Sequence, residues 1–200
     1  ETRQAFLTAT AAAVDEQVKR FAGDARYEMF AANFYSIVGD AAKAEEHAFK
    51  AAELSPRKQS ILFQLGSIYI ARKEYAKAYE VFKKAYEAEP SYSEALKYYA
   101  GALVYVGKEV EARDLMKKNG ISGDAFDDAF IPAYADLGQW DKVIKIMKAR
   151  VAIDPKSSQN RMNLVSAYFQ SGNKIAAVAQ LREMIVQDPN FKTTGEQYIQ

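Results

Sequence analysis

Prolines recur in this chain at a fixed distance, and this spacing is its most restrictive feature. Pro56 and Pro90 lie 34 residues apart, and so do Pro155 and Pro189. Proline cannot continue the hydrogen bonds of a helix, so each of these residues is expected to follow a helix end. A chain that repeats a segment of this length is expected to form successive copies of one unit, in which neighbouring copies bury each other's apolar faces.

The segment 59–92 is the most complete copy of the repeat. Its first part predicts a helix over 59–71, because Leu62, Leu65 and Tyr69 recur at the spacing that places side chains on one helical face. That apolar stripe has to be covered by another element of the same protein.

A second helix follows in the same segment, with its own stripe at Ala78, Phe82 and Ala85. Gly66 on the first helix is expected to face Ala78 where the two helices cross, with Phe82 wedged beside them. Glycine inside a helix costs up to about 1 kcal/mol in propensity. Close packing of the two helices is the expected compensation, and Pro90 ends the second helix.

Residues 59–92 resemble a tetratricopeptide repeat at every signature position except the first, where Leu62 stands in place of the usual tryptophan. The resemblance implies an all-α fold: an α-solenoid in which antiparallel helix pairs stack into a right-handed superhelix. It also implies that residues 1–200 form a single tetratricopeptide repeat domain.

The repeat divides the chain into consecutive parts, some of them irregular. The third unit lacks a closing proline, so Asn119 and Gly120 are expected to stop its last helix. Pro132 lies inside a helix of the fourth unit and is expected to kink or shorten it. Either this shapes a binding groove or it accommodates the short third unit. The predicted parts are an N-terminal capping half-repeat (1–24), five units (25–58, 59–92, 93–123, 124–157 and 158–191) and a C-terminal helical extension (192–200).

Composition narrows the classes of partner. The chain has 27 basic and 26 acidic residues and a net charge of +1, which argues against nucleic acid. It has no cysteine, so disulfides and thiol chemistry are excluded. No apolar run approaches the ~18 residues of a membrane-spanning helix, so this segment is not expected to insert into a membrane. Because the chain begins at Glu1 rather than methionine, we interpret it as an excised domain or a processed product.

Candidate catalytic residues do not form a recognisable site in the sequence. His47 is the only histidine, and with no cysteine it has no obvious partner for a metal site or a nucleophilic triad. We expect a surface or groove-lining histidine whose replacement by alanine changes stability little. The adjacent acids at 45–46 and 127–128 point about 100° apart on a helix, which indicates solvated faces. The sequence therefore predicts no enzyme, no metal and no cofactor.

The remaining signal is a binding surface. In tetratricopeptide arrays the first helix of each unit lines a concave face, and the resemblance implies that certain residues of that helix contact ligands. Here these residues are apolar, aromatic or neutral with few charges, which suits an extended or helical peptide with apolar anchors. Alternatively, some of them are buried by the neighbouring unit. The predicted partner-binding residues are Arg26, Met29, Phe30, Asn33, Phe63, Gln64, Ser67, Ile70, Lys97, Tyr98, Val104, Met162, Asn163, Ser166 and Phe169.

A finer resemblance rests on the short strings at 23–27, 53–61 and 188–192. They are similar to the soluble tail of bacterial membrane proteins of the O-antigen ligase and polymerase type. This implies a domain tethered beside an envelope glycan enzyme, on either side of a bacterial membrane. The leading hypothesis is a non-catalytic protein–protein interaction scaffold within a larger bacterial protein. The alternative is a regulatory or glycan-contacting domain tethered to an envelope polysaccharide ligase or polymerase.

Overall fold

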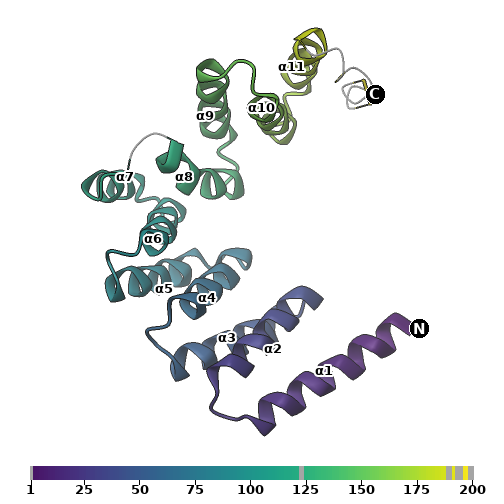
Figure 1. Cartoon of the computed structure of the whole chain (residues 1–200), viewed down its shortest axis with the longest axis vertical. Coiled ribbons are helices and arrows are strands. Elements are labelled where there is room, and N and C mark those ends of the chain that lie inside the picture. The colour runs from purple at the N-terminus through teal and green to yellow at the C-terminus, as the bar shows by residue number, and fades with distance from the viewer. Residues whose placement is uncertain (1, 122–123, 188–190, 192–195, 198–200) are drawn as a thin grey trace. The chain divides into compact units, whose positions relative to one another are not determined.

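The computed structural model describes residues 2–121, 124–187, 191 and 196–197, and these residues contain helices and turns but no strand. The helices follow one another along the chain (Figure 1). They are α1 (Thr2–Arg20), α2 (Ala25–Val38), α3 (Ala41–Leu54), α4 (Gln59–Ala71), α5 (Tyr75–Ala88), α6 (Ser93–Tyr105), α7 (Glu109–Lys118), α8 (Asp124–Asp136), α9 (Trp140–Ile153), α10 (Ser158–Gln170) and α11 (Lys174–Gln187).

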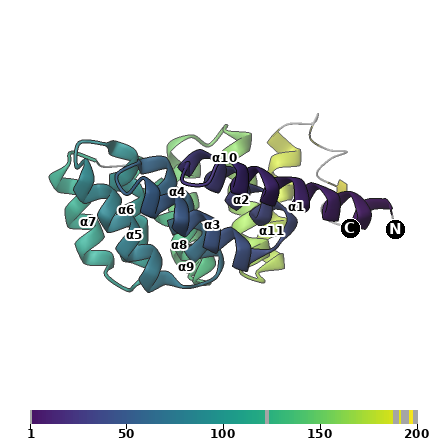
Figure 2. The ribbon, with the colours of Figure 1, turned by 90° about the horizontal axis from the view of Figure 1, so that it is seen from below.

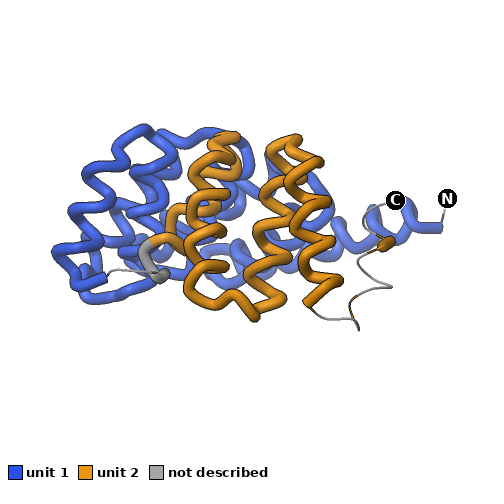
Figure 3. Tube along the Cα trace, turned by 90° about the horizontal axis from the view of Figure 1, so that it is seen from above, with its two compact units in different colours: residues 1–122 blue, residues 123–200 orange. Residues whose placement is uncertain are grey.

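The chain separates into two compact units, residues 1–122 (unit 1) and residues 123–200 (unit 2; Figure 3). In unit 1 the pairs α2–α3, α4–α5 and α6–α7 pack internally, each pair also contacts the next, and α1 packs on α2 (Figure 2). In unit 2 the helices α8 to α11 pack in succession in the same way. The predicted all-α class of stacked antiparallel helix pairs is confirmed. The single domain over residues 1–200 stays a prediction.

Helix ends follow the repeat period. The helix expected over 59–71 is α4, with the same bounds. The second helices α3, α5 and α9 each end two residues before Pro56, Pro90 or Pro155. Pro189 lies outside the described residues, as does nearly all of the extension expected over 192–200.

Two helices carry the irregularities expected from the sequence. The helix α7 has only 10 residues and ends at Lys118, next to Asn119 and the left-handed Gly120, as predicted. The helix α8 runs through Pro132 for 13 residues, as long as α4 and α6, so Pro132 does not shorten its helix. The alternative expectation, that Pro132 kinks the helix, stays a prediction. Phe130 and Tyr134 flank the proline and are fully buried, and their packing outweighs one lost backbone hydrogen bond.

The turns inside the helix pairs share one backbone feature. The residue just before the N-cap of the second helix has a positive φ in all five pairs, and in four of them it is a glycine. In the pair α4–α5 this residue is Lys73, with φ 60. Gly107 holds the same place in α6–α7 with φ 78, and nothing lies within 4 Å of where its Cβ would be. Lys73 therefore adopts the left-handed backbone conformation, which residues other than glycine disfavour.

The approach of α4 to α5 depends on Gly66. A Cβ added at Gly66 would lie 2.5 Å from Cε1 and Cζ of Phe82 on α5. Phe82 is buried, and its ring also stacks on Tyr98 of α6 at 5.0 Å between centroids, so it has little room to move. The expectation that Phe82 packs beside Gly66 is confirmed.

We expect Gly66→Ala to destabilise the chain by about 1–3 kcal/mol, because the added methyl group overlaps the Phe82 ring. Without that overlap, the same change would stabilise a helix by up to about 1 kcal/mol. Urea unfolding monitored by circular dichroism measures the difference. Ser67→Ala, at the next and exposed residue of α4, is the control and should stay within about 0.5 kcal/mol of wild type. A more stable Gly66→Ala protein would contradict the close contact.

We expect Lys73→Gly to stabilise the chain by about 0.5–1 kcal/mol, because glycine adopts the left-handed conformation without strain and this gain exceeds its entropic cost in the unfolded state. The reciprocal change, Gly107→Lys, should destabilise by a similar amount: nothing lies within 4 Å of the added Cβ, so the strain of the left-handed backbone is the expected cost. The same unfolding experiment checks both. Equal stability of the two variants would show that a positive φ at this position does not favour glycine over lysine.

Candidate functional site

The predicted contact residues of unit 1 lie on α2, α4 and α6, the first helices of its pairs; we call their surface the A-helix face. Most of these side chains are exposed or half-buried, with Phe30 at 56% exposure. Val104 is an exception because it is 3% exposed, which places it in the hydrophobic core rather than on a binding surface. Arg26 is exposed but bonded within the chain to Asp24 at 2.6 Å, and this bond lowers the Asp24 pKa to about 2.

Four aromatic rings form a stacked row on this face, which we call the aromatic ladder: Phe82, Tyr98, Phe63 and Tyr92. Phe82 and Tyr98 stack at 5.0 Å, Tyr98 and Phe63 at 4.5 Å, and Phe63 and Tyr92 at 6.0 Å. Phe82 is buried at the base, whereas Tyr98 is 36% and Tyr92 43% exposed. The ladder therefore joins the core of the α4–α5 pair to an accessible aromatic surface.

Two amide side chains lie on neighbouring helices of the same face. Gln64 Nε2 on α4 donates a hydrogen bond to Asn33 Oδ1 on α2. This bond uses one donor of Gln64 and one acceptor of Asn33. Both side chains keep further amide donors and acceptors that can bond to the backbone of a bound chain.

Unit 2 carries its own set of predicted contact residues on α10. Met162, Asn163 and Phe169 are half-buried, and Ser166 is exposed. Asn163 accepts a hydrogen bond from Gln159 of the same helix at 2.9 Å. These residues form a second, smaller surface that we describe only within unit 2.

Sequence reasoning missed Tyr92, which belongs to the aromatic ladder but not to a first helix. Tyr92 is the residue just before α6, where the chain enters the next pair, and its ring faces Phe63. The predicted contact positions were confined to the helices, so a residue in the turn was left out. An aromatic residue in the turn after Pro90 was the signal that could have found it.

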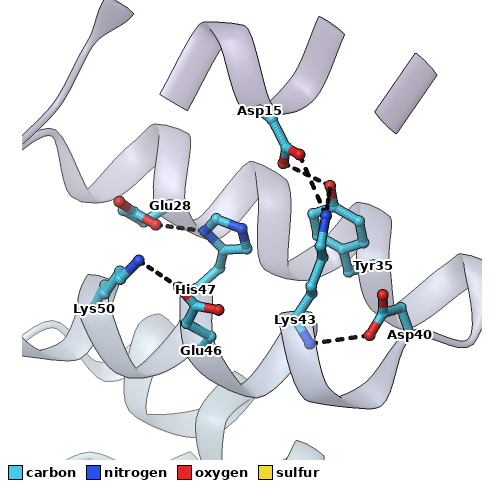
Figure 4. A network of polar contacts seen from close by, with 8 residues as sticks. All are labelled: Asp15, Glu28, Tyr35, Asp40, Lys43, Glu46, His47 and Lys50. Carbon is cyan, nitrogen blue, oxygen red and sulfur yellow. Dashed lines mark hydrogen bonds and ion pairs between the residues drawn. The ribbon is translucent and has the colours of Figure 1, made fainter. Parts of the chain in front are cut away.

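The expectation for His47 is wrong. His47 is 8% exposed, and its Nδ1 lies 2.7 Å from Oε2 of Glu28, which is 7% exposed (Figure 4). Its ring also stacks on Tyr35, with centroids 5.5 Å apart. The histidine faces α2 rather than solvent because it bonds Glu28 on that helix. The spacing of residues within α3 alone gave no sign of this partner. The pair holds α2 and α3 together.

A second polar cluster connects α1 to the same pair of helices (Figure 4). The Tyr35 hydroxyl donates to Asp15 Oδ1, and Lys43 Nζ lies 3.3 Å from Asp15 Oδ2 and 3.0 Å from the Tyr35 hydroxyl. Burial raises the Asp15 pKa, but the hydrogen bonds from Tyr35 and Lys43 outweigh it and leave the pKa below its usual value. This cluster fixes α1 against the first helix pair.

The adjacent acidic residues mostly act in ion pairs. The side chain of Glu45, expected on a solvated face, is only 23% exposed. It forms ion pairs with two residues of the next helix pair, Arg72 at 3.1 Å and Lys77 at 3.5 Å. Asp128 is 64% exposed and bonds Arg150 at 2.8 Å. In the described part of the chain, no three histidine, cysteine or acidic side chains group as a metal site would require, and no helix is long and apolar enough to cross a membrane.

Comparisons with known proteins agree with this architecture. Residues 59–92 match the model of the tetratricopeptide repeat family, so the resemblance of this segment is confirmed. No curated protein matches the sequence of the chain. Many solved structures are similar to it, and the three described next share 14–21% identity with it, which shows the fold alone.

The first of these is a tetratricopeptide repeat protein from Parabacteroides merdae (TM-score 0.65, 14% identity, 92% of this chain and 75% of that one). The second is PilW, described as a widely conserved type IV pilus biogenesis factor (TM-score 0.56, 17% identity, 94% of this chain and 89% of that one). The third is YrrB, described as having an unusual peptide-binding site (TM-score 0.50, 21% identity, 90% of this chain and 94% of that one). The fold is that of the tetratricopeptide α-solenoids. Neither the family model nor these structures links the chain to O-antigen ligases or polymerases.

We expect His47→Ala to destabilise the chain by about 3 kcal/mol, because Glu28 would remain buried without its partner. Glu46→Ala, at the preceding residue, removes only an exposed ion pair with Lys50 and should cost less than about 0.5 kcal/mol. Thermal and urea unfolding measure both. Adding Glu28→Ala to His47→Ala should cost less than the sum of the single changes. A His47→Ala protein as stable as Glu46→Ala would contradict the buried pair.

Proposed function

We propose that the chain is a non-catalytic protein–protein interaction scaffold, one module of a larger bacterial protein, whose A-helix face in unit 1 binds a peptide. The aromatic ladder carries this proposal. Phe63, Tyr92 and Tyr98 offer stacked, partly exposed rings, and the buried Phe82 supports this row through its stacking on Tyr98. Rings fixed before binding lose little entropy when an apolar side chain packs on them.

The amide groups beside the ladder favour a peptide over a small apolar ligand. Asn33 and Gln64 are bonded to each other and keep further donors and acceptors at the surface. Exposed Ser67 lies one turn further along α4 from Phe63 and Gln64. Aromatic anchors next to neutral hydrogen-bonding groups match a peptide with apolar side chains and an accessible backbone. The peptide-binding site ascribed to YrrB, a structure of the same fold, is consistent with this use of the scaffold.

A second candidate is a regulatory or glycan-contacting domain tethered to an envelope polysaccharide ligase or polymerase. Exposed rings such as Tyr92 and Tyr98 can also stack on the apolar faces of sugars, and this observation favours the candidate. The tether itself rests on the short sequence strings at 23–27, 53–61 and 188–192. Peptide and glycan binding by the same face predict different ligands and can be separated directly.

We expect a random peptide library displayed on phage to yield peptides with aromatic or aliphatic residues when selected on the wild-type chain. The Phe63→Ala/Tyr98→Ala variant should bind the selected peptides at least about 30-fold more weakly, since an anchor in a packed site is worth about 2 kcal/mol or more. Phe49→Ala is the control, because Phe49 is 50% exposed on α3, a second helix of the same unit. Calorimetry measures the affinities.

Ser67→Arg tests the face without altering the ladder, because the exposed serine is replaced by a bulky charge. It should weaken peptide binding while circular dichroism and melting temperature stay unchanged. Selection that yields no peptide, or peptides that bind equally well to Ser67→Arg, would overturn the proposal. Binding of envelope oligosaccharides in an array, lost in Ser67→Arg, would favour the glycan candidate instead.

A further inference from the structure

A cleft lies between α5, α6 and α7; we call it the α7 cleft. The helix α7 has 10 residues, whereas α3, α5, α9 and α11 have 14 each. Four missing residues correspond to about 6 Å of helix. The last turn of α5 therefore has no counterpart in α7, and a cleft of about 700 Å³ remains beside it. This volume is within the ~300–1,000 Å³ of ligand pockets.

The floor of the α7 cleft is aromatic and apolar. Tyr99 and Leu103 of α6 are buried there, and Tyr86 of α5 stacks on Tyr99 with centroids 5.4 Å apart and planes 20° apart. Val110, at the start of α7, is 75% exposed at the edge. The stacked tyrosines hold the Tyr86 ring in place along one wall.

The rim of the cleft carries three acidic and two basic side chains. Glu87 from α5 and Glu111 and Asp114 from α7 line it, against Lys108 and Lys118. Lys108 is occupied, because its Nζ lies 3.4 Å from the Tyr79 hydroxyl and 3.7 Å from Glu111.

The acidic residues affect the floor of the cleft. Burial and a hydrogen bond with Tyr79 raise the pKa of Tyr99, and the negative charges of Glu111 and Glu87 raise it further. Asp114 has no ion pair among the described residues, and Glu87 contacts Lys83 only at 3.8 Å. The cleft therefore combines a fixed aromatic wall with carboxylates that have bonding capacity left.

We propose that the α7 cleft is a second binding site, which takes an arginine side chain from a basic segment of a partner protein. The guanidinium would lie against the Tyr86 ring and bond the carboxylates of Glu87 and Asp114. Guanidinium groups pair with carboxylates through two parallel hydrogen bonds and stack on aromatic faces, so one side chain satisfies both parts of the cleft. A neutral apolar anchor would leave the carboxylates of Glu87 and Asp114 unpaired, and an acidic one would place a like charge beside them.

The probe is a fluorescein-labelled tetra-arginine peptide, with tetra-citrulline as its neutral counterpart of nearly the same shape. We expect fluorescence anisotropy to show that the chain binds tetra-arginine and not tetra-citrulline. Glu87→Gln/Asp114→Asn should weaken the binding about tenfold or more, because two charge-assisted hydrogen bonds are lost. Tyr86→Leu should weaken it several-fold while keeping the wall apolar.

The matched control is Glu16→Gln/Glu53→Gln, which changes the net charge by the same amount at exposed acids of α1 and α3. It should stay within about twofold of wild type, because α4 to α6 lie between these helices and α7 (Figure 1) and charges beyond ~10 Å are screened at 0.1 M salt. Equal weakening by both double variants would show a response to net charge alone and overturn the proposal. Equal binding of the two peptides by wild type would overturn it as well. Ser67→Arg should bind tetra-arginine as wild type does, which separates this site from the A-helix face.

Discussion

The close packing of small side chains between paired helices is the constraint on which the structure depends. Two helices of 13 or 14 residues cannot bury their apolar stripes by themselves, so each pair has to be covered by the next. The contact is close because alanines such as Ala31, Ala78 and Ala112 are fully buried and Gly66 has no side chain at all. Helix axes approach only as far as the side chains between them allow. Larger residues at these positions would separate the helices and expose the stripes.

Because this packing repeats, the sequence predicts much of the fold. The bounds of α4 follow from the local spacing of Leu62, Leu65 and Tyr69, and all three are buried. Helix ends near Pro56 and Pro90 also depend on local backbone chemistry. Pro132 shows where local reasoning stops: α8 continues through it, because buried neighbours on both sides hold the helix to the rest of unit 2.

The candidate sites were less predictable because their residues meet across helices. His47 is the only histidine of the chain, so no other helix pair has a matching residue, and its burial depends on Glu28 one helix earlier. Tyr92 joins the aromatic ladder from a turn, and Val104 is covered although its position in the repeat suggested an exposed side chain. The repeat pattern predicts which way a side chain points from its helix. It does not predict which residues of neighbouring segments pack against that side chain, and these three residues differ from expectation for that reason.

Phe82 links the core to the proposed binding face, and this has an energetic consequence. One part of its ring lies against Gly66, and the ring also stacks on Tyr98. A peptide that fixes Tyr98 in the stack therefore binds best when α4, α5 and α6 are packed as observed. By mass action, such a ligand at 100 times its Kd stabilises the folded chain by about 2.7 kcal/mol. Since interactions in a solenoid are mostly between neighbouring repeats, this stabilisation should be concentrated in the α4–α7 pairs of unit 1. Binding at the surface and cohesion of the stack would then be two effects of the same contacts.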